Sequence, residues 1–468
     1  MLFSSMTFVY MFLPLVCLAY KIVDKDLKNY VLLLASILFY AWGEPRYLAI
    51  MLLTILVNYA GAYYISHSKN NVHRKLLLIV TVIIDISFLF YFKYFNFFIE
   101  NINQAFSYNF NFIKVIMPIG ISFYTFQALS YVVDVYRRDV EVQKDICKLA
   151  LYICFFPQLI AGPIIKYHDI QHQISNRDET FDKVAYGIKR FIIGLSKKML
   201  LANTLGAVAD KIFNQPVEQF DCYTAWLGAI AYSFQIFYDF SGYSDMAIGL
   251  GAIFGFKFLE NFNYPYISQS ITEFWRRWHI SLSTWFKEYL YIPLGGNRKG
   301  KPRQYINLFI VFLATGFWHG AAWNFIFWGL WHGLFIIFEK ATNWHKKEGN
   351  LIINITKHLY TIFVFIIGWV MFRADTMSYA FEYIKNMFGR VTEHKIAYQH
   401  QYYIDNIEII ALLTAFFCAM PICRNILNIN PQNKIRYALT NIWLLLLFIV
   451  SSSAIASSTY NPFIYFRF

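Results

Sequence analysis

The sequence has few charged residues. Asp, Glu, Lys and Arg together make up 15% of its 468 residues, whereas a soluble domain usually carries about a quarter. Hydrophobic residues make up 58% and aromatic residues 20%, and aromatic side chains gather at the two interfaces of a membrane. The composition excludes an ordinary soluble protein and predicts an all-α, polytopic integral membrane protein.

Cysteine is also scarce, and its spacing excludes two classes of stabilised fold. The six cysteines show no metal-ligand spacing, and five of them lie in or beside apolar stretches. We therefore expect buried thiols, with no disulfide framework and no metal site. The first 20 residues lack a basic region and a small-residue cleavage site, which predicts a retained first span and not a signal peptide.

The net charge of +13 could indicate a nucleic-acid partner. Lys and Arg fall mainly in short loops beside apolar stretches, which is typical of cytoplasmic loops of membrane proteins. We expect the lipid bilayer as partner and no nucleic acid. Apolar stretches predict spans near residues 2–20, 30–43, 46–66, 76–98, 115–136, 357–372, 406–423 and 437–456. Basic residues follow the first, third and fifth spans, so the N-terminus is expected outside the cell.

The chain is predicted to form one transmembrane domain, 1–468, in four parts. N-terminal spans occupy 1–138, a re-entrant and interfacial segment 139–222, a catalytic core 223–340, and C-terminal spans 341–468. Pro157, Gly162 and Pro163 interrupt the second part, and non-helical backbone at membrane depth is tolerated where it is buried in protein or lines a cavity. Residues 181–213 are expected to lie along the cytoplasmic interface.

The densest set of Trp, Arg and His side chains lies between residues 270 and 303. Ser270 and Glu273 have capping-box spacing, which predicts a helix from about residue 271. On that helix Trp275 and His279 would share a face, with Arg276 and Arg277 between them. The following stretch, Asn297, Arg298, Lys299, Gly300 and Lys301, could hold the phosphates of a donor or be an ordinary basic loop.

About 35 uncharged residues precede Glu339, and they contain His319 and His332. His319 would lie about 22 Å along a straight helix that starts after Arg303. A neutral imidazole can serve as a base and then as an acid, although a structural hydrogen bond is the simpler alternative. On a continuous helix His332 would lie about 20 Å further along and on another side, so it is expected to be structural.

Two carboxylates, Asp239 and Asp245, lie in a Gly- and Ser-rich apolar stretch. They could stabilise a helix break or face a substrate route.

Several separate stretches resemble one family. They are PIGISFYTFQALSYVVDVYR (118–137), FFPQLIAGPI (155–164), FQIFYDFSGYSDMAIGL (234–250), FKFLENFNYPYISQSITEFWRRWHISLSTWFKEYLYIPLGGNR (256–298), GFWHGAAWNFIFWGLWHG (316–333) and NPFIYFRF (461–468). The chain resembles the membrane-bound O-acyltransferase family, within it the bacterial branch that O-acetylates polysaccharides such as alginate and peptidoglycan. The resemblance implies a ring of about 10–12 transmembrane helices around a central tunnel, in the bacterial cell membrane.

The resemblance also implies roles. His319 and His279 match the family's histidines and are expected to be catalytic. Acetyl would come from a cytoplasmic donor, acetyl-CoA, with no bound cofactor, and would pass to a separate extracytoplasmic acetyltransferase of the SGNH type. Asn297, Arg298 and Lys299 are expected to bind the donor. The expected substrate-binding residues are Trp275, Arg276, Arg277, Trp318, Asn324, Asp239 and Asp245.

Two alternatives remain open at this point. The first, within the same family, is the D-alanyl transfer protein of teichoic acid modification, whose donor is a carrier protein. The second is a transporter or flippase without chemistry, although many transporters show halves related by pseudo-symmetry and this sequence repeats only a Gly-x-Trp-His-Gly motif, at 316–320 and 329–333.

Overall fold

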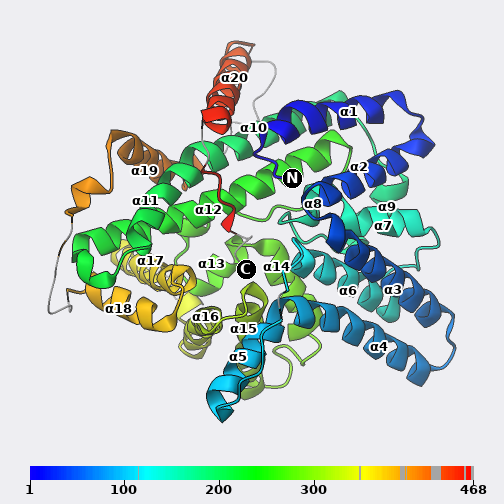
Figure 1. Cartoon of the computed structure of the whole chain (residues 1–468), viewed down its shortest axis with the longest axis horizontal. Helices are drawn as coiled ribbons and strands as arrows, with labels where there is room; N and C mark the ends of the chain where they lie inside the picture. The colour runs from blue at the N-terminus through cyan, green and yellow to red at the C-terminus, as the bar shows by residue number, and fades with distance from the viewer. Residues whose placement is uncertain are drawn as a thin grey trace. The chain divides into compact units, whose positions relative to one another are not determined.

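The computed structural model describes residues 1–113, 115–346, 349–389, 396, 398–422, 434–457 and 460–464. Within these residues the secondary structure is helical, and none of them lies in a strand (Figure 1). The all-α class predicted from composition is confirmed. The chain forms two compact units, Met1–Phe191 with Met246–Leu259, and Ile192–Asp245 with Glu260–Phe468. We describe each unit by itself.

The first unit holds the N-terminal helices around a buried central helix. Its helices are α1 (Leu13–Ile22), α2 (Lys28–Gly43), α3 (Leu48–His67), α4 (Asn71–Leu89), α5 (Phe95–Phe106), α6 (Ile121–Arg137), α7 (Ile146–Cys154), α8 (Phe156–Leu159), α9 (Tyr167–Ser175) and most of α10 (Phe181–Ser196). Helix α6 packs against α3 and α4, and nearly all of its side chains are buried. The predicted span 115–136 therefore begins later than expected and is wrapped by protein.

Pro157 and Gly162 break the segment that follows, as their sequence context predicted. Pro157 lies in the first turn of α8, and residues 151–167 are buried throughout. A side chain at Gly162 would begin 2.6 Å from Cα of Gln158. Burial in protein is the condition under which irregular backbone persists in a membrane protein. The re-entrant course of this segment stays a prediction.

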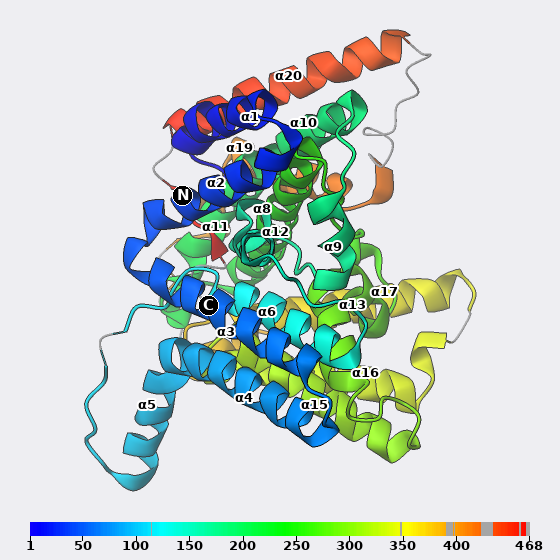
Figure 2. The ribbon, with the colours of Figure 1, turned by 90° about the vertical axis from the view of Figure 1, so that its right-hand side faces the viewer.

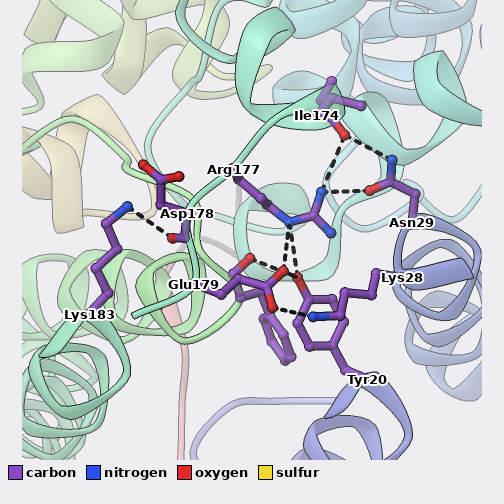
Figure 3. A network of polar contacts seen from close by, with 9 residues as sticks. Tyr20, Lys28, Asn29, Ile174, Arg177, Asp178, Glu179 and Lys183 are labelled. Atoms are coloured by element: carbon purple, nitrogen blue, oxygen red, sulfur yellow. Dashed lines mark hydrogen bonds and ion pairs between the residues drawn. The ribbon is translucent and has the colours of Figure 1, made fainter. Parts of the chain in front are cut away.

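A network of polar side chains fastens the loops of the first unit together (Figure 3). Arg177 donates to the Tyr20 hydroxyl at 3.0 Å and to the Asn29 side chain at 2.7 Å. Lys28 forms an ion pair with Glu179. Partial burial of Glu179 would raise the pKa of its carboxyl, but the bonds from Lys28 and Tyr20 outweigh burial and lower it. The network ties the last turn of α1 and the first turn of α2 to the loop before α10.

The second unit carries the residues of the predicted catalytic core. Its helices are α11 (Asn203–Phe213), most of α12 (Cys222–Ile253), α13 (Ile271–Arg277), α14 (Ile280–Phe286), α15 (Lys301–His319), α16 (Trp323–Ala341), α17 (Leu351–Arg373), α18 (Met377–Met387), α19 (Asn406–Cys418) and α20 (Lys434–Ser457). Helix α16 contacts α13, α15 and α17, and these four helices position the site.

Five helical stretches of the described residues are long and apolar enough to cross a membrane. They are Pro45–His67, Asn71–Phe106, Phe181–Phe213, Leu351–Arg373 and Lys434–Ser457. Four of them cover predicted spans. The fifth, Phe181–Phe213, was expected to lie along the interface, and its length and composition also permit a crossing. The segments predicted near 2–20 and 406–423 form shorter apolar helices, Phe8–Ile22 and Asn406–Cys418.

The span predicted at 76–98 is not one straight helix. A π-helical turn, Phe90–Tyr94, separates α4 from α5, and α5 leaves the direction of α4 at that turn (Figures 1 and 2). Insertions of this kind interrupt the regular hydrogen-bond ladder and bend helices.

Candidate active site

Helices α15 and α16 form a hairpin, and the turn between them directly follows His319. Helix α15 stops at His319, and α16 begins at Trp323. The two helices pack closely because glycines face backbone: a side chain at Gly316 would begin 2.5 Å from the Phe325 carbonyl oxygen, and one at Gly329 would begin 2.4 Å from that of Phe312. The two Gly-x-Trp-His-Gly repeats therefore form the contact between the helices, as expected for small residues in membranes.

The His319 ring lies in an aromatic box. Its centroid is 4.9 Å from that of Trp318, 4.8 Å from that of Trp328 and 5.3 Å from that of Phe372. The side chain is 3% exposed. Such a setting excludes bulk water and weakens the screening of any charge that develops on the ring.

His332 is linked to this box through Trp328. Because the chain reverses after His319, Trp328 on α16 reaches the His319 ring, and His332, one turn further along α16, packs against the same Trp328 with ring centroids 5.2 Å apart. It also lies 5.5 Å from Trp275. The expectation that the two histidines are far apart was wrong, since it assumed one uninterrupted helix. His332 nevertheless lines neither cavity described below.

His279 does not lie on the helix that carries Trp275. Helix α13 ends at Arg277, and His279 has a left-handed backbone, with φ of 44°. The expectation that Trp275 and His279 share one face of a helix was therefore wrong. The His279 Nδ1 atom lies 3.2 Å from the Asn261 side-chain oxygen, and the ring centroid is 6.1 Å from that of Trp318. Trp318 thus lies beside both candidate histidines.

A large cavity of about 850 Å³ opens beside α13, α14 and α15. The predicted residues Asn297, Arg298, Lys299, Trp275 and Arg276 all line it. Two further cations that sequence reasoning missed also line it, Lys287 and Lys340. No Asp or Glu is among the described residues that form its wall. The cavity therefore has the charge expected of a site for a phosphorylated molecule.

Arg277 lies apart from this cavity. Its guanidinium donates to Glu273 at 2.9 Å and to the Asn263 carbonyl at 3.1 Å. The expectation that Arg277 binds substrate is not supported by its position.

A smaller cavity of about 150 Å³ is lined by Phe372 of the aromatic box. Asn324, which was expected to bind substrate, also lines it, together with Arg373, Asp210 and Asp375. Phe372 contacts His319, and Thr315, one turn before His319 on α15, lines the large cavity. His319 itself lines neither cavity, but residues next to it line both of them.

The two carboxylates Asp239 and Asp245 form ion pairs. Asp239 pairs with Lys198 at 2.6 Å and Asp245 with Lys197 at 2.7 Å. Neither aspartate lines either cavity, and their positions favour the structural alternative over the substrate route. Among the described residues, no group of three or more His, Cys, Asp and Glu side chains is placed to hold a metal ion.

Glu339 is a buried positioning residue that the sequence gave no reason to select. Its carboxylate accepts from the backbone N–H groups of Ile271 at 2.6 Å and Thr272 at 2.8 Å. It thereby caps α13, where a negative charge is favourable, and fixes Trp275 and Arg276 on the wall of the large cavity. Because Glu339 lies 67 or 68 positions along the chain from the N–H groups that it accepts from, no local sequence pattern identifies it as their acceptor.

We expect Glu339→Ala to lower the free energy of unfolding by about 3 kcal/mol, because two buried N–H groups lose a charged acceptor. Glu339→Gln keeps one acceptor oxygen and should lose less. The apparent melting temperature in detergent tests this order. Equal melting temperatures for the parent and the Ala variant would contradict the capping role.

Comparison with known proteins places this geometry in a family. Residues 2–374 match the model of the membrane-bound O-acyltransferase family. The chain is 39% identical to the probable alginate O-acetylase AlgI of Pseudomonas putida over the full length of both, and 37% identical to the peptidoglycan O-acetyltransferase of Helicobacter pylori over 83% of this chain and 80% of that one. It is 31% identical to the teichoic acid D-alanyltransferase of Bacillus subtilis over 50% of this chain and 62% of the relative. The chain therefore belongs to the membrane-bound O-acyltransferase family and is a multi-pass membrane enzyme.

Proposed function

We propose that the chain takes acetyl from acetyl-CoA on the cytoplasmic side and passes it outward for O-acetylation of an extracytoplasmic polysaccharide. The observation that carries the proposal is the position of His319, which is buried beside Phe372 in the wall of the smaller polar cavity and one turn from Thr315 in the wall of the large cationic one. The relatives that match most of the chain are named for O-acetylation of alginate and of peptidoglycan, which supports acetyl as the group and a polysaccharide as its destination.

The large cavity would hold the donor. Acetyl-CoA carries phosphate groups, and Arg298, Lys299 and Arg276 offer them charged hydrogen-bond donors. The thioester would then extend along α15 toward Thr315 and His319.

His319 would transfer the proton. As the acceptor hydroxyl attacks the thioester carbon, the new C–O bond forms, the C–S bond breaks, and the imidazole takes the hydroxyl proton. The same imidazole then gives that proton to the departing thiolate, so the reaction needs no outside acid or base. His279 is proposed as an auxiliary residue that acts through Trp318, because this indole ring lies beside both histidines.

The smaller cavity would admit the acceptor from the extracytoplasmic side. We propose that the acceptor is presented by a separate acetyltransferase protein of the SGNH type, which carries the acetyl group to the polymer. The outward orientation rests on the distribution of Lys and Arg between loops.

Thioester turnover by the purified protein tests the proposal. We expect acetyl-CoA to be cleaved, with release of the free thiol, faster when the extracytoplasmic acceptor is present. Cleavage of a D-alanyl carrier-protein thioester in place of acetyl-CoA would contradict the proposed donor and favour the teichoic acid role.

A further inference from the structure

The C-terminal segment Tyr460–Ile464 forms part of the wall of the smaller cavity. Pro462 and Ile464 line that cavity. Phe463 and Ile464 are 4% and 6% exposed, and the Phe463 ring lies 4.7 Å from that of Tyr243 on α12. The segment therefore shares a cavity wall with Phe372, whose ring contacts that of His319.

A buried ion pair holds the backbone of this segment. Lys198 and Asp239 lie 2.6 Å apart, and their side chains are 3% and 2% exposed. The Lys198 ammonium also donates to the Pro462 carbonyl, and the Asp239 carboxylate accepts from the Ile464 N–H at 2.8 Å. Each charged side chain thus contacts the other member of the ion pair and forms one hydrogen bond with the backbone of the segment.

The burial of the Lys198–Asp239 ion pair indicates what this pair does in the protein. Removing two charges from water is costly, and replacing such a pair by apolar side chains is often neutral or stabilising. Ionisable groups inside membrane proteins therefore usually have a role beyond stability. Here the observed role is to bond two main-chain groups of the segment, which fixes its path.

A second contact ties the start of the segment to the same cavity. The Tyr460 hydroxyl donates to Asp210 at 2.6 Å, and Asp210 also accepts from Arg373 at 2.7 Å. Asp210 and Arg373 both line the smaller cavity. The segment is thus fastened near both of its ends to residues around one space.

We propose that Lys198 and Asp239 are positioning residues that clasp the segment 460–464 and thereby complete the wall of the smaller cavity beside His319. The consequence for acetyl transfer rests on the proposed function, whereas the clasp itself does not. Asp239, which the sequence suggested as a substrate contact, acts in this account through the segment that it holds.

The test compares two double variants of the full chain. Lys198→Met with Asp239→Asn removes both charges of the clasp and nearly preserves volume. Lys197→Met with Asp245→Asn removes the neighbouring pair, which joins the same helical stretches. Each protein, in detergent, is treated with a carboxypeptidase that digests from the C-terminus, and the mass of the intact chain is followed with time.

We expect the parent to retain residues 460–464, and the clasp variant to lose them at least about tenfold faster, because trimming follows local opening. The neighbouring-pair variant should be trimmed at the parent rate. Equal resistance of the clasp variant and the parent would overturn the proposal, and so would equally fast trimming of both double variants.

A milder variant covers the case in which the clasp variant does not fold. Tyr460→Phe removes the hydroxyl bond to Asp210 and leaves the ion pair in place, so trimming should accelerate by a smaller factor. If the segment stays as protected as in the parent, it is held by contacts other than those proposed.

The effect on the reaction is measured separately. In the clasp variant we expect kcat for acetyl transfer to fall at least about tenfold with little change in KM for acetyl-CoA, since the donor cavity is unaltered. A variant that exposes the segment and transfers acetyl at the parent rate would refute the positioning role. A parent protein without acetyl transfer would instead refute the proposed function. The trimming result would still test whether Lys198 and Asp239 hold the segment 460–464.

Discussion

Replacing His319 by glutamine should lower acetyl transfer by at least about a hundredfold, because a positioned general base typically contributes 10²–10⁴-fold. Glutamine has a similar volume and can form a hydrogen bond, but it cannot take a proton near neutral pH. The aromatic box around His319 leaves little room for water to replace the base. The chemistry should therefore fail while the fold persists.

His332→Gln is the matched control for this prediction. His332 is also a buried imidazole packed on Trp328, but none of the described rings that it packs against lines the smaller cavity, whereas Phe372 beside His319 does. We expect its loss to cost less than about tenfold in transfer, as for a packing residue outside the reacting groups. Both variants are assayed at equal protein level in membranes, with melting temperature checked. Equal losses in the two variants would mean that aromatic packing and not proton transfer explains the requirement for His319.

Replacing Arg298 and Lys299 together by glutamine should raise KM for acetyl-CoA by about tenfold or more and leave kcat nearly unchanged. Each charged hydrogen bond to a phosphate contributes about 1.5–3 kcal/mol, and both side chains are exposed, so screening reduces the sum. Loss of binding that is equal in the ground and transition states appears in KM alone. The increase should shrink as the ionic strength of the assay rises.

The first turn of α15 supplies a control of equal charge. Lys301 and Arg303 lie close to Arg298 and Lys299 but do not line the cavity. Their replacement by glutamine removes two positive charges as well, and we expect KM to change by less than about threefold, the size of a screened surface effect. Similar increases in the two double variants would show that the overall charge of the loop, and not the cavity, attracts the donor.

Sequence patterns predicted the parts of the site that depend on local composition. The basic, glycine-rich stretch 297–299 lines the large cavity, and His319 is buried beside residues that line each of the two cavities. Ser270 accepts from the Glu273 N–H at 3.0 Å, so the predicted start of α13 at Ile271 is confirmed. These features follow from residue type and from spacing within a few positions.

The helix ends beside His279 and His319 could not be predicted from residue type and local spacing. No Pro or Gly marks the end of α13, and His279 takes a left-handed backbone that its residue type does not announce. The hairpin after His319 lies within about 35 uncharged residues, a run that fits one long helix as well as two short ones. Close packing of Gly316 on α16 selects the hairpin.

Contacts between residues far apart in the sequence could not be predicted from sequence patterns either. Glu339 caps a helix 67 or more positions earlier, and Asp239 binds the backbone of Ile464, 225 positions later. A carboxylate in an apolar stretch signals that a partner exists, but the partner is decided by tertiary packing. The sequence alone therefore left Asp239 open between a structural and a substrate role.

The central claim is that acetyl passes from a donor at the cationic cavity, past His319, to the opposite face of the membrane. Everted membrane vesicles test it most directly, because they expose the cytoplasmic face to added radiolabelled acetyl-CoA, which does not cross lipid. With the parent protein and its extracytoplasmic acceptor enclosed, ester-linked label should accumulate inside the vesicles, and with His319→Gln it should not. Label that enters equally with both proteins, or esters that form inside without label from acetyl-CoA, would contradict the account.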